Sequence, residues 1–158
     1  MAAFNDILNQ NGISECEIKP IYWNNTKLIL NVEESKIKNS GNGIFTYQFI
    51  PKESLIGEYF GQVKKADGSC VGDYSFGLNK DYYVDARYYP RAYIAMINDS
   101  HGSTFKNNCE FRIEKKSKNG KRLRAKDYKI SLWAIRNIQV GEELYADYGL
   151  EYWKCSRY

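Results

Sequence analysis

The chain has 158 residues and a formal net charge of +4; 43% of its residues are hydrophobic and 27% are charged. This length and composition are typical of one globular domain with its own core, and they exclude a disordered low-complexity chain. No apolar run reaches the length that a membrane-spanning helix needs, and residues 1–12 lack the basic region and the long apolar stretch of a secretory signal.

Taken in chain order, the periodicity of apolar residues predicts many short strands and little helix. Apolar residues at helical spacing predict a short helix over residues 3–10, which ends near Gly12. Residues 91–98 fit either a helical turn or a buried strand. The segments that predict strands are 27–32, 43–50, 54–63, 73–78 and 81–86. The pattern therefore predicts a single β-rich α+β domain.

Positive charge concentrates in residues 115–129, where eight basic residues and one Asp give a net charge of +7. Asn119 and Gly120 predict a tight turn because both residue types tolerate positive φ, with residues 111–118 and 121–135 as the two arms. Such a hairpin is either a solvated edge guarded by like charges or a patch for nucleic acid or a nucleosome face. The side chains expected to make such contacts are Lys121, Arg122 and Arg124.

Composition and spacing alone do not name an activity. The four cysteines form no CxxC pair, so we expect a reducing compartment and no zinc cluster. Serine hydrolase chemistry would need the single histidine, His101, which lies in a polar loop typical of a turn. Adjacent carboxylates occur at Glu33-Glu34 and Glu142-Glu143, and neighbouring residues of a strand face opposite ways, which makes them poor acid/base pairs.

The order of several short motifs is more informative. Along the chain these motifs are SGNGIF, GEYFG, DYSFGL, YYVDARYY, INDS, NNCEF, GEELYADYG and EYW. This series resembles the SET domain of protein lysine methyltransferases over about residues 28–155, and GEELYADYG is close to that family's GEEL-x-x-DYG signature. The resemblance implies an α+β, β-rich fold of several small sheets, with one segment threaded under another as a pseudoknot near the C-terminus.

The resemblance also implies domain limits and a cofactor. We expect one SET domain over residues 1–158, with an N-terminal flank (1–27), a core (28–149) and a closing segment (150–158). S-adenosylmethionine is the expected cofactor, and no metal is expected. The residues expected to contact this cofactor are Gly41, Asn42, Gly43, Tyr74, Asn98, Asp99, Tyr152 and Trp153.

Within that set the expected roles differ. The backbone around Gly41 and Gly43 would wrap the methionine end, because glycine lets a ligand approach closely. Asn98 would hydrogen-bond the cofactor, and Asp99 stands where the family usually has His. Tyr152 and Trp153 either stack on the adenine or wall the peptide groove, or they pack the C-terminal segment onto the core.

Two tyrosines match the family's catalytic positions. Tyr148 matches the catalytic tyrosine, and Tyr59 matches the tyrosine that lines the lysine channel, to which Phe111 would also contribute. Ala146 stands two residues before Tyr148, where the family restricts the number of methyl groups. Alanine indicates room for di- or trimethylation unless Tyr145 fills the gap.

The resemblance therefore implies a protein-lysine N-methyltransferase with a histone tail as the expected substrate. We expect an intracellular, nuclear chromatin protein without membrane association. Two alternatives remain open at this stage: a methyltransferase for a non-histone protein, and a catalytically inactive SET-like binding module.

Overall fold

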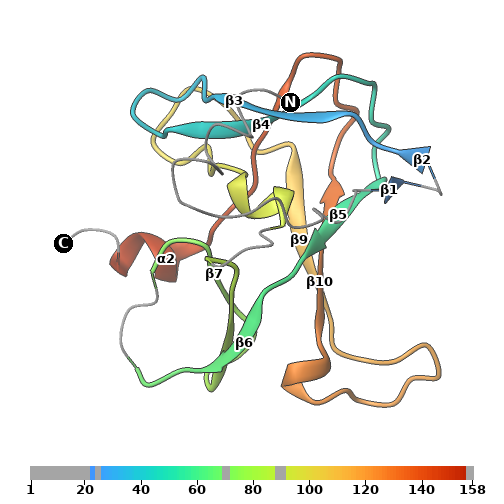
Figure 1. Cartoon of the computed structure of the whole chain (residues 1–158), viewed down its shortest axis with the longest axis vertical. Helices are drawn as coiled ribbons and strands as arrows, with labels where there is room; N and C mark the ends of the chain where they lie inside the picture. Colours follow the sequence, from blue (N-terminus) through green and yellow to red (C-terminus); the bar gives the residue numbers. More distant parts are fainter. Residues whose placement is uncertain (1–21, 24–25, 69–71, 88–91, 156–158) are drawn as a thin grey trace, which may run out of the picture.

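The computed structural model describes residues 22–23, 26–68, 72–87 and 92–155. The helix expected over residues 3–10 lies outside these described residues. Figure 1 shows several small sheets packed around a common centre, with the short helix α2 (Leu150–Cys155) near the C-terminal end of the described chain. None of the helices in the described ranges is long and apolar enough to span a membrane.

The described strands form four small sheets. A two-stranded sheet pairs β1 (Tyr22–Trp23) with β2 (Thr26–Lys27). The second sheet has the order β11-β4-β3, with bounds Glu143–Leu144, Asn42–Thr46 and Leu30–Glu34. The third has the order β5-β10-β9, with bounds Leu55–Tyr59, Lys129–Ala134 and Cys109–Glu114. The fourth has the order β6-β8-β7, with bounds Gln62–Lys65, Tyr82–Asp85 and Ser75–Gly77.

One expected strand ends earlier than predicted, and another divides into two. The strand expected over residues 43–50 ends at Thr46, because its hydroxyl donates to Gln48 O (2.6 Å) and closes a local turn. The segment 54–63 forms two strands in different sheets, β5 and β6. The chain changes sheet at Gly61, where a Cβ atom would lie only 2.3 Å from the carbonyl oxygen of Asp85.

Other local expectations are confirmed with shorter bounds. The segments 73–78 and 81–86 form the antiparallel hairpin β7–β8. Residues 91–98 contain the 3-10 helix η1 (Tyr93–Met96), which corresponds to the helical turn rather than the strand.

The expected basic hairpin is present in the structure. Strands β9 and β10 pair from Lys129↔Glu114 to Ala134↔Cys109. The tight turn expected at Asn119 and Gly120 is confirmed, and of these two residues only Gly120 has a positive φ, +80°. One glycine in the left-handed region suffices for a three-residue hairpin loop. The return arm also contains the 3-10 helix η2 (Ala125–Asp127), which the pattern did not predict.

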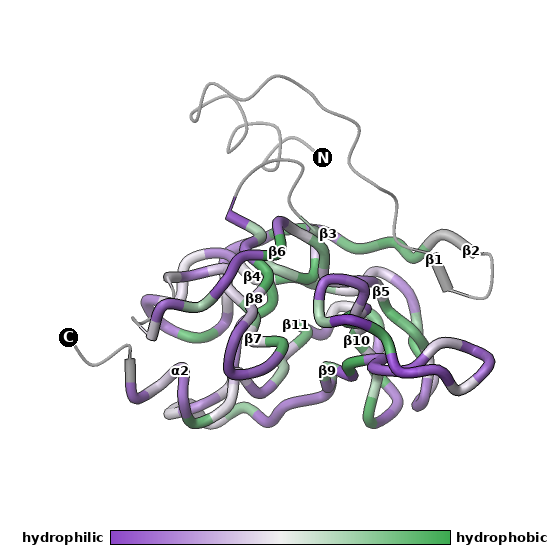
Figure 2. The backbone as a smooth tube through the Cα atoms, turned by 90° about the horizontal axis from the view of Figure 1, so that it is seen from below, coloured by the Kyte–Doolittle hydropathy of each residue, from purple (hydrophilic) through white to green (hydrophobic). Residues whose placement is uncertain are grey.

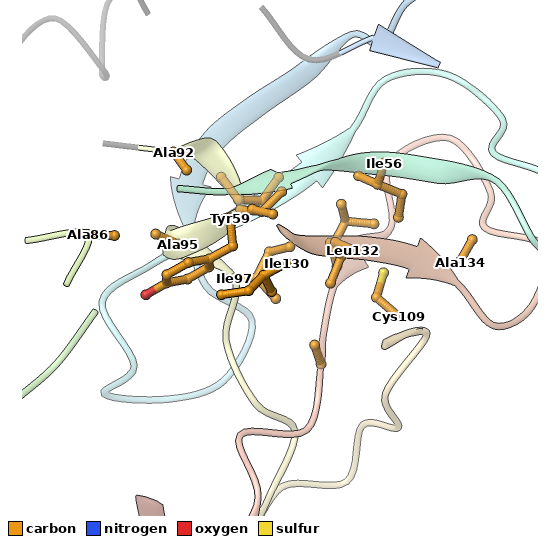
Figure 3. Close-up of a cluster of buried hydrophobic side chains, with 14 of the residues drawn as sticks. Ile56, Tyr59, Ala86, Ala92, Ala95, Ile97, Cys109, Ile130, Leu132 and Ala134 are labelled. Carbon is orange, nitrogen blue, oxygen red and sulfur yellow. The ribbon is translucent and has the colours of Figure 1, made fainter. Parts of the chain in front are cut away.

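The core lies between the sheets. Figure 3 shows Ile56 and Tyr59 from β5 and Ile130 and Leu132 from β10 beside Ile97, which follows η1. All five side chains are buried, and each buried aliphatic side chain contributes about 1.5–3 kcal/mol to folding. Figure 2 shows the hydrophobic stretches along the central strands and hydrophilic stretches along outer loops.

The C-terminal segment is threaded between two earlier segments. Tyr145 forms a parallel bridge with Asn98, and Ala146 forms one with Cys109. The amide of Ala146 donates to Asn98 O (3.0 Å), and the amide of Cys109 donates to Tyr145 O (2.9 Å). This arrangement confirms the expected pseudoknot, and it brings the end of the chain to residues 97–99.

Candidate functional site

A cleft of about 1050 Å³ gathers most of the residues that the sequence singled out. Its walls come from the β3–β4 turn, β5, β7, η1 and the residues after it, β9 and the C-terminal segment. A volume of this size accommodates a cofactor-sized molecule. The expected site residues that line the cleft are Gly41, Asn42, Tyr59, Tyr74, Asn98, Asp99, Phe111, Tyr148, Tyr152 and Trp153.

Three expected site residues are not among the residues that line this cleft: Gly43, Tyr145 and Ala146. A Cβ atom on Gly43 would lie 2.0 Å from Glu143 Oε1, so the space that this glycine leaves is filled by a carboxylate. Ala146 is fully buried in the pseudoknot. Tyr145 is buried, and its hydroxyl donates to Glu143 Oε2 (2.6 Å).

Glu143 organises the floor beside the cleft, and the motif analysis did not assign it a role. Glu143 is only 2% exposed, and its carboxylate accepts hydrogen bonds from Ser35 Oγ (2.7 Å) and from the backbone amide of Lys36 (2.8 Å). It also accepts bonds from Tyr145 and from Asn98 Nδ2 (3.3 Å). Several donors satisfy this buried carboxylate, as burial of a charge requires.

The neighbouring Glu142 has a different environment. It pairs with Arg136 at 2.6 Å and accepts a hydrogen bond from the Gln139 amide at 2.7 Å. The hydrogen bond from Arg136 lowers the pKa of Glu142 below its usual value. The two adjacent glutamates therefore have separate partners, as the alternation of side chains along a strand predicts.

The side chain of Asn98 is held in place through hydrogen bonds donated by its amide nitrogen. Its Nδ2 donates to Asn42 O (3.0 Å) and to Glu143, while its backbone carbonyl accepts from Ala146. Among the described residues, no donor reaches Asn98 Oδ1. An amide oxygen accepts hydrogen bonds, so the half-buried Asn98 brings an available acceptor to the cleft.

Asp99 fixes the positions of two aromatic residues of the C-terminal segment. Its Oδ2 accepts from the backbone amide of Tyr148 (2.8 Å) and from Trp153 Nε1 (3.0 Å). Its Oδ1 accepts from the backbone amide of His101 (2.9 Å), and the His101 ring stacks on Trp153 with centroids 4.7 Å apart. Trp153 therefore both lines the cleft and packs α2 against the site.

Tyr148 lies where several of these elements meet. Its hydroxyl donates to the carbonyl oxygen of Ile97, and its ring contacts the edge of Tyr152 with centroids 4.7 Å apart. Burial, together with the nearby Tyr152 and Asp99, raises the pKa of the Tyr148 hydroxyl above its usual value. The raised pKa favours the protonated hydroxyl, which is the form that donates the hydrogen bond to the Ile97 carbonyl.

Three rings form an aromatic cluster in the cleft: Tyr59, Phe76 and Phe111. Their centroids lie 5.5 Å (Tyr59–Phe76), 5.9 Å (Tyr59–Phe111) and 5.0 Å (Phe76–Phe111) apart. All three line the cleft. Phe76 lies within the DYSFGL motif, but the motif analysis assigned it no role.

Two further features lie in the wall of the cleft that β7 and the residue before it form. Tyr74 has φ +61°, a strained value for a bulky residue and one that is often found at binding sites. Ser75 Oγ is buried and, within the described ranges, has no hydrogen-bond partner. Because Ser75 lines the cleft, a bound molecule can satisfy this hydroxyl.

Comparison with known families and structures agrees with this geometry. The SET domain family model matches residues 41–149. No curated protein matches the chain. The limits of the flank (1–27) and of the core from residue 28 stay a prediction.

Two solved structures illustrate the similarity of fold. One is KRYPTONITE in complex with mCHH DNA, H3(1-15) peptide and SAH, with 24% identity and a TM-score of 0.61 over 78% of this chain. The other is ctPRC2 in an autoinhibited conformation bound to S-adenosylmethionine, with 23% identity and a TM-score of 0.60 over 77% of this chain. The matches span only 24% and 15% of those chains.

Proposed function

The chain belongs to the SET-domain family, and on that premise we propose that it is an S-adenosylmethionine-dependent protein-lysine N-methyltransferase. One observation carries the proposal. The hydroxyl-bearing Tyr148 and the aromatic cluster line the same cleft as Asn98, the expected cofactor ligand. A site with this composition can hold a polar cofactor at one end and an alkyl amine at the other.

The cleft fits the cofactor. Asn98 Oδ1 is an acceptor without a partner among the described residues, and it suits the ammonium group of a methionine moiety. The buried Ser75 hydroxyl also lacks a partner in the described chain, which a hydrogen-bonding ligand would correct. The residues that would hold the cofactor are Gly41, Asn42, Tyr74, Asn98, Asp99, Tyr152 and Trp153.

When bound, S-adenosylmethionine supplies a methyl group on a positive sulfur; its transfer forms a carbon–nitrogen bond to the lysine amine while the carbon–sulfur bond breaks with its electron pair on sulfur. The protein must therefore deliver a neutral amine, whereas free lysine has a pKa of about 10.4. The apolar walls of the aromatic cluster disfavour the ammonium form, and the proton leaves to solvent. The same rings attract a methylated ammonium through their π faces.

Tyr148 contributes by position. Its hydroxyl is bound to the Ile97 carbonyl and its backbone amide to Asp99, so the ring is fixed at both ends. A fixed polar group beside the aromatic cluster orients the amine, and alignment of reacting groups lowers the barrier substantially. The hydrogen bond from the Tyr148 amide to Asp99 keeps this tyrosine in the cleft, which supports an active site rather than an inactive binding module.

We further propose a histone tail as the substrate and a nuclear location. The solved KRYPTONITE complex contains an H3 peptide, and the basic segment 115–129 suits a nucleosomal setting. Di- or trimethylation stays the expected outcome. The Tyr145 hydroxyl is bound to Glu143 away from the lining of the cleft, which supports room near the amine.

The test is transfer of labelled methyl groups from S-adenosylmethionine to free histones, nucleosomes and total cell protein. We expect label on a histone with the native chain, loss of label with Tyr148→Phe, and retained label with Tyr82→Phe. Tyr82 lies in β8, is exposed and does not line the cleft, so it is a matched control.

Other outcomes of this assay are also decisive. Label confined to the cell-protein mixture would replace the histone with another protein substrate. If no acceptor is labelled and calorimetry detects no cofactor binding, the proposed methyltransferase activity is contradicted. The remaining alternative would then be a catalytically inactive SET-like binding module.

A further inference from the structure

We propose that the basic hairpin, defined here as residues 115–129, is a binding surface for the phosphate backbone of duplex DNA. This surface is separate from the methyl-transfer cleft, because none of its residues lines that cleft. The inference goes beyond the proposed function and does not depend on catalysis. Four observations carry it: exposure, lack of internal pairing, distribution over both arms, and shape.

The positive charges of the basic hairpin are exposed and mostly uncompensated. All of its eight basic residues are exposed. Among the described residues only Arg124 finds a carboxylate, that of Asp127 at 2.8 Å. Elsewhere in the described chain, Arg112 pairs with Glu53 and Glu110, and Arg136 pairs with Glu142.

The arrangement is unfavourable within the isolated chain. Lys116 and Arg122 form an isolated bridge and so stand directly opposite each other across the hairpin. Like charges in opposite positions of two paired strands destabilise the pairing. A net charge of +7 within fifteen residues adds to this repulsion. An external polyanion would remove the repulsion, whereas nothing among the described residues does.

Protection of the edge strand β9 accounts for only part of the pattern. In the order β5-β10-β9 the outer strands are β5 and β9, and guarding charges are expected on β9, which leads into the basic hairpin. Only three of the eight basic residues lie on the β9 side of the turn. The other five follow Gly120 on the arm that leads into β10, which is the central strand of the sheet. The residues on that arm are Lys121, Arg122, Arg124, Lys126 and Lys129.

The shape of the hairpin selects duplex DNA. Figure 1 shows the connection between β9 and β10 as a two-armed projection beyond the sheet. The major groove of B-form DNA admits a two-stranded ribbon, whereas the deep, narrow groove of A-form RNA does not. Surfaces for single strands use exposed aromatic rings for stacking, and the one aromatic residue of the basic hairpin, Tyr128, is partly buried against the hydrophobic core. The contacts expected are to phosphates and therefore independent of base sequence.

The test is binding of the full chain to a fluorescent duplex of about 20 base pairs, followed by anisotropy as salt is raised. With about four phosphates engaged, affinity falls roughly a hundredfold between about 50 and 200 mM salt. Neutralising Lys118, Lys121 and Arg122 to Gln reduces the slope of log affinity against log salt by about 3. These side chains are exposed and have no carboxylate partner in the described chain, so the variant is expected to fold.

A matched variant changes Lys38, Lys52 and Lys80 to Gln, which removes the same charge from exposed positions on other turns. We expect it to keep the native slope. An equal loss of DNA affinity and of salt dependence in both variants would show that only the net charge of the chain matters, which would overturn the proposal. Absence of binding by the native chain would also overturn it, as would tighter binding of an RNA duplex or a single strand. Melting temperatures of both variants report whether each is folded.

Discussion

The indole nitrogen of Trp153 donates a hydrogen bond to Asp99 Oδ2 at 3.0 Å, the same oxygen that accepts the backbone amide of Tyr148 at 2.8 Å. One carboxylate therefore fixes both α2 and the tyrosine of the cleft. The family usually has His at this position, and here an acidic side chain joins three N–H donors, including that of His101.

The first prediction concerns this carboxylate. Asp99→Asn replaces one acceptor oxygen with an NH₂ group that faces N–H donors, so we expect the free energy of unfolding to fall by about 1–3 kcal/mol. Cofactor affinity should fall as well, because α2 loses its attachment to the cleft. Denaturant unfolding and calorimetry measure the two effects. Trp153→Phe removes one of the three bonds together with part of the ring packing on His101, so it tests the attachment of α2 alone. Unchanged stability and unchanged cofactor affinity in Asp99→Asn would contradict the account.

The second prediction compares two adjacent glutamates. Glu143→Gln removes a buried, multiply hydrogen-bonded carboxylate and should lower the free energy of unfolding by about 3 kcal/mol. Glu142→Gln breaks a largely solvated pair with Arg136 and should cost less than about 1 kcal/mol. Both are measured by denaturant unfolding under the same conditions. Equal effects at the two positions would refute the structural role assigned to Glu143.

The third prediction concerns pH. The raised pKa of Tyr148 keeps its hydroxyl protonated, so kcat/KM should rise with pH as the substrate amine loses its proton and should show no decline up to about pH 10. A raised pKa in the folded state favours folding below the pKa of the unfolded tyrosine, about 10, and this contribution is lost as pH rises through the folded pKa. We therefore expect stability to fall only above about pH 10 on account of this group.

Steady-state rates and tyrosinate absorbance check this behaviour together. A rise of activity near neutral pH that coincides with tyrosinate absorbance in the native chain and in Tyr82→Phe, with no such absorbance in Tyr148→Phe, would assign Tyr148 the role of a base and contradict the neutral-hydroxyl account.

The fourth prediction concerns Ser75. Its hydroxyl is buried without a partner in the described chain, so Ser75→Ala should leave the melting temperature of the free protein unchanged or slightly raised. If a bound ligand satisfies this hydroxyl, the same substitution weakens cofactor binding by about 0.5–1.5 kcal/mol, or roughly two- to tenfold. Melting curves with and without S-adenosylhomocysteine separate the two effects. Unchanged ligand affinity would show that the hydroxyl makes no contact with the cofactor.

Sequence-based prediction succeeded where the determining residues lie close together in the chain. The hairpin β7–β8 and the turn at Gly120 follow from alternation and turn residues within a few positions. The motif resemblance also identified residues that the fold brings into one cleft, such as Asn98 and Tyr148. Their roles in cofactor binding and catalysis stay predictions until the experiments above are done.

Sequence by itself determined the β-rich character of the chain, the position of its basic hairpin and its membership of the SET family, because each depends on local pattern or on an ordered series of motifs. Only the tertiary structure decided that Gly43 makes room for Glu143, and that this carboxylate binds Ser35, 108 positions away. It also decided that Phe76 joins the aromatic cluster and that Ser75 Oγ is buried without a partner in the described chain. These features arise from contacts between segments far apart in sequence, and local propensity carries no information about which distant groups will meet.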